Sequence, residues 1–301
     1  MGIAVEGAEH IPDGQWVKER LVEGYESSIK TAARLFEATT RFQRLEIYET
    51  PYFGKILVLD GAVQTTEKDE SFYHEMLVTL PLLYHGAPEK VLVIGGGDGG
   101  ALRHALDFPV QEAWMCELDE EVTEACRRFM PAIAGGAFED PRAHVVFEDG
   151  FDFLGRFESA FDAILIDSPD PMGEAKKLFS DEFYALIKKA LRPGGVVSCQ
   201  AGSPWLQSEE GAFVARSLAR AFRFARPYLG QVLSYPGVVW MYVFASDDID
   251  PLAVEKNVIE TRLDELRESG NSLRYLSPAY ATACFALPAW VERVVEEGSW
   301  R

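Results

Sequence analysis

Two segments of the first 85 residues have hydrophobic positions near helical spacing. Between residues 15 and 40 the apolar side chains recur every three to four residues, and we expect a helix there. The same pattern returns over Ser71–Tyr84 and ends at the helix-breaking run Gly86-Ala-Pro88. The first segment carries its apolar positions at Trp16, Leu21, Tyr25, Ile29, Ala32 and Leu35.

The segment between these helices has the period of β-strands. Gln43–Thr50 alternates between polar and apolar residues, and the pair Asp60-Gly61 separates Lys55–Leu59 from Ala62–Thr65. Asp-Gly between two apolar runs is typical of a two-residue hairpin turn. We therefore predict that residues 1–85 form an N-terminal helix plus a small β-rich domain.

From Lys90 onward, strand patterns alternate with helical ones, which predicts a parallel sheet with crossover helices over residues 86–301. The expected strands are Val91–Ile94, Ala113–Glu117, His144–Phe147, Ala163–Ile166, Val196–Gln200 and Val239–Ala245, and the expected helices are Ala101–Leu106, Glu120–Phe129 and 211–225.

Composition narrows the class of protein. A formal net charge of −19 argues against nucleic acid, because phosphate binding depends on Lys and Arg, and it favours cationic ligands instead. No apolar stretch approaches the roughly 20 residues of a membrane span, so we expect no membrane partner. The N-terminus lacks a signal-peptide pattern, and the four cysteines are widely spaced, as expected of a cytoplasmic protein.

The first candidate site is the strand and glycine-rich loop Val91–Gly100. Its glycines allow the backbone to approach a ligand closely, just before a helix begins. Glu117 ends the next expected strand about 20 residues later, where an acidic residue binds ribose hydroxyl groups. Asp149, in Glu148-Asp149-Gly150, follows a third strand and could accept from an adenine amino group. Dinucleotides and adenosyl-sulfonium compounds both fit this pattern.

The second candidate site is the loop Asp167-Ser-Pro-Asp170-Pro-Met-Gly173. Asp167 follows a buried strand at the end where open α/β sheets bind ligands. A proline-stiffened loop with two aspartates can present both carboxylates to one small cation, although a turn with capping aspartates has the same composition.

These motifs together resemble the polyamine aminopropyltransferases typified by spermidine synthase, over roughly residues 40–290. The resemblance is carried by Phe42-Gln43, Leu57–Gly61, Val63–Glu67, Asp69-Glu70, Tyr73–Met76, Ile94–Gly100, Cys116–Asp119, Asp149-Gly150, Asp167–Gly173 and Gln200. It implies a Rossmann-like, methyltransferase-type parallel sheet domain beside a small β-rich N-terminal domain. It also implies a homodimer or homotetramer that uses decarboxylated S-adenosylmethionine as co-substrate, with no cofactor and no metal.

The resemblance assigns roles by position. Asp167 would be the catalytic acid–base residue, with Tyr73 beside it, and Asp98 would face the aminopropyl tail. The donor-binding residues would be Gln43, Gly95, Gly97, Asp98, Glu117, Asp149, Gly150 and Glu174, and the acceptor-binding residues His74, Asp98, Asp167, Asp170, Gln200 and Tyr235.

Two positions depart from the family's loop, which commonly has Ser or Thr where this chain has Pro169 and Pro where it has Glu174. The acceptor therefore stays open: putrescine is our first choice, and thermospermine- or spermine-type and broad-specificity enzymes are alternatives. A small-molecule methyltransferase shares the sheet, and a non-catalytic polyamine sensor would share the acidic cleft.

Overall fold

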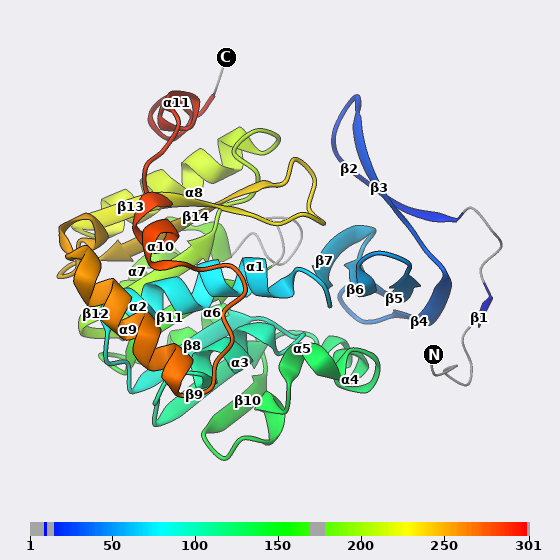
Figure 1. Ribbon diagram of the computed structural model, residues 1–301, viewed down its shortest axis with the longest axis horizontal. Helices are drawn as coiled ribbons and strands as arrows, with labels where there is room; N and C mark the ends of the chain where they lie inside the picture. The colour runs from blue at the N-terminus through cyan, green and yellow to red at the C-terminus, as the bar shows by residue number, and fades with distance from the viewer. Residues whose placement is uncertain (1–8, 11–14, 169–177, 300–301) are drawn as a thin grey trace.

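The chain folds into a small N-terminal β domain and a larger α/β domain (Figure 1). The computed structural model describes residues 9–10, 15–168 and 178–299. In the described residues the N-terminal part has a five-stranded sheet of order β1-β4-β5-β6-β7 and a separate β2-β3 hairpin. Its strands are β1 Glu9–His10, β2 Trp16–Val22, β3 Tyr25–Lys30, β4 Ala33–Thr39, β5 Arg44–Thr50, β6 Gly54–Leu59 and β7 Ala62–Thr66.

The helix predicted over residues 15–40 is wrong, because this segment forms β2, β3 and β4. Val22 pairs with Tyr25 across a turn in which Gly24 has a φ of 84°. Lys18 and Arg20 are exposed while Glu19 between them is buried, which is the two-residue period of a strand. The helical spacing of the large apolar residues arose from three short strands read as one segment.

The hairpin predicted at Asp60-Gly61 is confirmed. Leu59 of β6 pairs with Ala62 of β7, and the two turn residues have φ angles of 48° and 85°. Positive φ at both central positions is the geometry of a type I′ turn, which Asp and Gly tolerate better than other residues.

The larger domain is built on a seven-stranded sheet of order β10-β9-β8-β11-β12-β14-β13. The first five strands are parallel, and β14 and β13 extend the sheet in antiparallel pairs. The predicted Rossmann-like parallel sheet is therefore confirmed. The strands are β8 Lys90–Gly95, β9 Glu112–Glu117, β10 Ala143–Phe147, β11 Phe161–Asp167, β12 Leu191–Gln200, β13 Phe224–Gln231 and β14 Val239–Ser246.

Helices cover both faces of this sheet (Figure 1). The helix expected over 211–225 ends earlier, since α8 stops at Ala221 and Phe224 begins strand β13. The α-helices are α3 Gly100–Leu106, α4 Glu120–Phe129, α5 Pro131–Ala134, α6 Gly150–Leu154, α7 Asp181–Ala190, α8 Ser208–Ala221, α9 Lys256–Glu268, α10 Pro278–Ala283 and α11 Ala289–Glu297. Among the described residues, no helix is long and apolar enough to cross a membrane.

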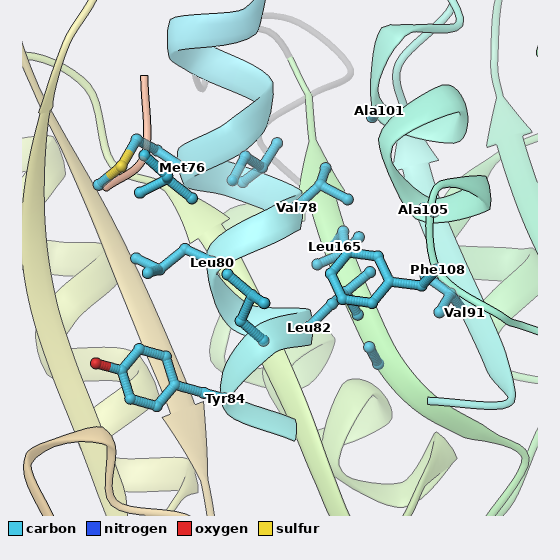
Figure 2. Packing of buried hydrophobic residues seen from close by; sticks show 14 of the residues in the cluster. Met76, Val78, Leu80, Leu82, Tyr84, Val91, Ala101, Ala105, Phe108 and Leu165 are labelled. Carbon is cyan, nitrogen blue, oxygen red and sulfur yellow. The ribbon is translucent and has the colours of Figure 1, made fainter. Parts of the chain in front are cut away.

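The predicted helix over Ser71–Tyr84 is confirmed and packs into the core of the larger domain. It consists of α1 Glu70–His74, a π-helical turn η1 Glu75–Thr79, and α2 Leu80–His85. Figure 2 shows Val78 and Leu82 on the side of this helix that faces Leu165 and α3, while Met76, Leu80 and Tyr84 point to the opposite side. The domain boundary after residue 85 stays a prediction.

The π-helical turn is tied to the C-terminal part of the chain by Glu75. This fully buried carboxylate accepts hydrogen bonds from the backbone N–H groups of Arg274 (2.6 Å), Tyr275 (3.1 Å) and Leu276 (2.7 Å). Tyr275 also accepts from the backbone N–H of Gln231, at the end of β13. We call residues 274–276 the strap. It links the helix that carries Tyr73 and His74 to the sheet edge beside them.

We expect Glu75→Ala to destabilise the fold, because it leaves three backbone donors of the strap without their acceptor. The free energy of unfolding should fall by roughly 2–4 kcal/mol. Urea denaturation followed by circular dichroism measures this loss. Glu265→Ala, an exposed position on α9, is the matched control and should change stability by less than about 0.5 kcal/mol. Equal stability of the two variants would contradict a structural role for the strap contact.

Candidate active site

A cavity of about 480 Å³ lies at the carboxyl ends of the parallel strands and reaches the N-terminal domain. This edge is where open α/β sheets bind their ligands. Twelve of the fourteen predicted site residues line it: Gln43, Tyr73, His74, Gly95, Gly97, Asp98, Glu117, Asp149, Gly150, Asp167, Gln200 and Tyr235. The other two, Asp170 and Glu174, lie outside the described residues.

The glycine-rich loop after β8 is packed too tightly for side chains. Gly95 has a φ of 84°, and a Cβ atom there would lie 2.1 Å from the backbone oxygen of Asp167. A Cβ atom at Gly97 would lie 3.0 Å from the Glu117 carboxylate. The backbone N–H of Gly96 donates to the Asp167 carbonyl at 3.0 Å. The loop therefore joins the ends of β8, β9 and β11 into one binding edge.

Glu117, at the end of β9, is fixed by its own backbone turn. One carboxylate oxygen accepts from the backbone N–H of Asp119 at 2.9 Å, and the other faces Gly97. Burial raises the pKa of Glu117 to about 7, while the backbone N–H groups of Asp119 and Leu118 oppose the shift. Near neutral pH the Glu117 carboxyl group is therefore partly ionised and partly protonated. It can accept a hydrogen bond from a ligand hydroxyl group or donate one to it.

Asp119 connects the N-terminal domain to this edge, and the sequence patterns did not indicate that role. Its carboxylate accepts from Thr40 Oγ1 at 2.7 Å and from Gln43 Nε2 at 3.1 Å. The amide nitrogen of Gln43 donates to Asp119, so a residue of the larger domain sets the orientation of the Gln43 side chain in the cavity.

Asp149 and Gly150 lie at the start of helix α6. Asp149 Oδ1 accepts from the backbone N–H of Phe151 at 2.8 Å, which caps the helix. A Cβ atom at Gly150 would lie 2.6 Å from Ile94 Cγ2, so only glycine allows this close approach to β8. The pair lines the cavity in the short connection between strand β10 and helix α6.

Asp167 and Tyr73 form a hydrogen-bonded pair at the centre of the cavity. Tyr73 Oη donates to Asp167 Oδ1 at 2.8 Å, although the residues are 94 positions apart. Burial raises the pKa of Asp167 to about 6, with a further increase from Asp98, while His74 and the Tyr73 hydroxyl oppose the shift. This carboxylate can both accept a proton near neutral pH and bind a cation.

His74 lies between the acidic residues of the loop and of the strand. Its Nδ1 is 2.9 Å from Glu70 Oε2, and its Nε2 is 3.8 Å from Asp98 and 3.9 Å from Asp167. Burial alone would lower the pKa of His74, but the carboxylates of Asp98, Glu70 and Asp167 raise it to about 9. Asp98 itself accepts from the backbone N–H of Gly100 at 2.8 Å, at the start of α3.

Tyr235 and Gln200 form the opposite wall, and their polar atoms have protein partners. Tyr235 Oη donates to the backbone oxygen of Gln64. Gln200 Nε2 donates to the Ser168 carbonyl at 3.2 Å, and its Oε1 accepts from the Gly202 N–H at 2.9 Å. Both side chains are thereby held rigidly against the cavity.

Glu19 of β2 is a cavity residue that sequence reasoning missed. It is 8% exposed, lines the cavity and accepts from the backbone N–H of Val63 at 3.1 Å. A buried acid in the middle of an alternating strand is the signal that could have found it, but the segment was interpreted as a helix. Glu19 adds a negative charge to the wall formed by the N-terminal domain.

Two groups of side chains among the described residues have the ligand types of a metal site. In each group, one ligand atom of every residue lies within 4.8 Å of the others. The groups are Glu70, His74 and His104, and His74, Asp98 and Asp167. Both depend on His74, whose Nδ1 faces Glu70, and the expectation of a metal-free site stays a prediction.

Family models match both parts of the chain. Residues 15–67 match the spermidine synthase tetramerisation domain, and residues 70–257 match the spermine/spermidine synthase domain. The chain is 38% identical to the polyamine aminopropyltransferase of Caldicellulosiruptor saccharolyticus over 93% of this chain and 98% of the relative. It is 37% identical to that of Bacillus subtilis over 93% and 99%.

Solved structures agree with these matches. A crystal structure of spermidine synthase in complex with the transition state analogue AdoDATO superposes with a TM-score of 0.89 at 35% identity, over 94% of this chain and 96% of that chain. Spermidine synthase from Thermotoga maritima superposes with a TM-score of 0.87 at 35% identity, over 94% and 95%.

We expect Gly100→Ala to disturb this site, because the new Cβ atom would lie 2.2 Å from the His74 ring. Although alanine favours a helix, the clash should lower the free energy of unfolding by about 1–3 kcal/mol. Thermal or urea unfolding measures the change. The control is Gly155→Ala, whose Cβ atom would lie 3.5 Å from the Phe151 carbonyl. A Gly100→Ala protein as stable as that control would show that the ring can move away without cost.

Proposed function

The chain belongs to the spermine/spermidine synthase family and is an aminopropyltransferase, and from this premise we propose that it transfers the aminopropyl group of decarboxylated S-adenosylmethionine to putrescine. The observation that carries the proposal is the Tyr73–Asp167 hydrogen bond next to Asp98, inside a cavity bounded by the glycine-rich loop. This arrangement offers a base to the amine and a carboxylate to the donor's tail.

The adenosyl part of the donor would lie along the strand ends. Glu117 would accept from the ribose hydroxyl groups, and Asp149 with Gly150 would meet the adenine. Gln43, oriented by Asp119, would contact the donor from the N-terminal domain. Gly95 and Gly97 would allow close backbone approach, and Glu174 is proposed to contact the donor on the sequence resemblance alone.

Asp98 would select the donor by its charge. Intact S-adenosylmethionine carries a carboxylate and an ammonium on its tail, whereas the decarboxylated form carries only the ammonium. Asp98 is 8% exposed, so a carboxylate brought beside it would be repelled in a partly desolvated site. A few kcal/mol of such repulsion suffices for the preference.

Asp167 would act as the base that frees the amine for attack. An alkylamine with a pKa near 10.4 is neutral in only about one of 2,500 molecules at pH 7, which corresponds to about 4–5 kcal/mol. Asp167 would hold the ammonium, take or relay its proton as nitrogen attacks the methylene beside the sulfonium, and be oriented by Tyr73. Methylthioadenosine leaves as a neutral thioether.

The acceptor would occupy the side of the cavity formed by Tyr235 and Gln200, near His74. Burial, followed by the charges of Asp167, Asp69, Asp98 and Glu19, raises the pKa of Tyr235 well above its ordinary value. The hydroxyl of Tyr235 therefore stays protonated in a strongly negative environment that favours diammonium ligands. Asp170 would add a second carboxylate for the acceptor. Since Asp170 and Glu174 could bind additional ammonium groups, longer polyamines are the alternative acceptors.

The assembly and the location are proposed on separate grounds. The match of residues 15–67 to a tetramerisation domain supports an oligomer, and we propose a homotetramer with a homodimer as the alternative. All four cysteines are buried free thiols, which supports a reducing, cytoplasmic location.

The acceptor test is a panel of amines with mass detection of products. Putrescine, cadaverine, agmatine, spermidine and norspermidine are each incubated with the decarboxylated donor and, in parallel, with intact S-adenosylmethionine. We expect spermidine from putrescine, with methylthioadenosine released only from the decarboxylated donor. Preference for spermidine would favour the spermine- or thermospermine-type alternative, methyl transfer would favour a methyltransferase, and no product from any pair would favour a sensor.

Asp167→Asn should lower kcat by about 10²–10⁴, because it keeps the size of the side chain and removes the proton acceptor. Donor affinity, measured by calorimetry with methylthioadenosine, should change little. In the wild type, kcat/KM should fall as the pH drops through about 6, where Asp167 becomes protonated. Asp152→Asn, at an exposed position of α6, is the control. Near-normal turnover of Asp167→Asn would exclude the proposed base.

A further inference from the structure

Both ring nitrogens of His74 face carboxylates. Nδ1 is within hydrogen-bonding distance of Glu70, and Nε2 points between Asp98 and Asp167. Nδ1 donates a hydrogen bond to the Glu70 carboxylate. Nε2 is too far from the two aspartates for a hydrogen bond, but both carboxylates are close enough for their charges to favour a proton on this nitrogen. The groups that face His74 are Glu70 and Tyr73 from α1, Asp98 from the glycine-rich loop, His104 from α3, and Asp167 from β11. Arg103 of α3 donates to the other side of this cluster, at Glu70.

The neighbouring His104 differs from His74. Its ring nitrogens also lie near carboxylates, at 3.7 Å from Glu70 and 3.8 Å from Asp107, but each nitrogen has a closer partner that determines its state. Arg103 Nη2 lies 3.0 Å from His104 Nε2, and a guanidinium can only donate, so this imidazole nitrogen is the acceptor. His104 Nδ1 then donates to Thr79 Oγ1 at 3.1 Å. Burial lowers the pKa of His104 to about 4, in agreement with the geometry. Of the two stacked imidazoles, the charge belongs to His74.

We propose that His74 is a buried imidazolium that acts as a positioning residue, holding Asp98 and Asp167 ionised side by side. The expected effect of His74 on turnover rests on the proposed role of Asp167. The charge of the His74 ring does not depend on that role. The His74 side chain is 2% exposed and lines the cavity beside the two aspartates.

The charge balance of the cluster supports this role. The cluster contains three carboxylates and two cations, so its negative charge is only partly offset. The carboxylates are Glu70, Asp98 and Asp167, and the cations are His74 and Arg103. One negative charge remains, and it faces the cavity through the two aspartates. Without the imidazolium, two adjacent buried carboxylates would repel each other and one would become protonated.

Nitrogen NMR tests the charge without any activity. In ¹⁵N-labelled protein, long-range ¹H–¹⁵N spectra distinguish an imidazolium, whose two nitrogens have similar shifts, from a neutral ring. The His74 signals are identified by their loss in His74→Gln. We expect an imidazolium at pH 7.5 that loses its proton only near pH 9. A neutral His74 ring at pH 7.5 would overturn the proposal. If the variant fails to fold, the absence of any imidazolium among the five histidines of the wild-type protein at pH 7.5 would overturn it equally.

The second measurement is the pH dependence of kcat/KM in His74→Gln and in a matched control. Removing the cation should raise the pKa of Asp167, so the acidic limb should move up by about one pH unit and activity at pH 6 should fall about fivefold more than at pH 8.5. His144→Gln, on edge strand β10 against Trp114, should keep the wild-type profile. An unshifted limb with only a higher acceptor KM would overturn the proposal in favour of a direct contact. An inactive wild type with an NMR-proven imidazolium would instead count against the proposed function alone.

Discussion

The crowding of negative charge inside a desolvated cavity is the constraint on which the rest of this structure depends. Asp98 and Asp167 are brought together where water screens them poorly, and like charges in such a place disfavour ionisation. The protein compensates with the Tyr73 hydroxyl, the His74 ring and helix-start N–H groups. The remaining deficit of positive charge at the two aspartates favours the cationic ligands proposed for this cavity.

This crowding requires close backbone packing. The parallel strands bring their carboxyl ends to one edge, and the glycine-rich loop lets the ends of β8 and β11 approach until a single Cβ atom at Gly95 would clash with Asp167. Gly100 likewise leaves room for the His74 ring, with which a Cβ atom at this position would clash. Glycines in this loop therefore make room for the protein's own charged groups as well as for a ligand.

Much of the larger domain and its binding edge could be predicted from sequence because the signals are local. A buried strand followed by glycines, or by an acid such as Glu117, identifies the edge within a few residues. The N-terminal strands could not be predicted in this way, because Gly24 was not recognised as a turn within an apparently helical pattern. The hydrogen-bond partners of Glu75 and Asp119 are distant in sequence, and the pattern of neighbouring residues cannot predict such contacts.

The hydrogen bonds between Glu75 and the strap also bear on the order in which the chain folds. They join residues about 200 positions apart, so they form only after nearly the whole chain is available. During synthesis from the N-terminus, the sheet and the glycine-rich loop emerge well before residues 274–276. The helix that presents Tyr73 and His74 therefore reaches its final set of contacts only after the strand ends and the glycine-rich loop of the cavity are available.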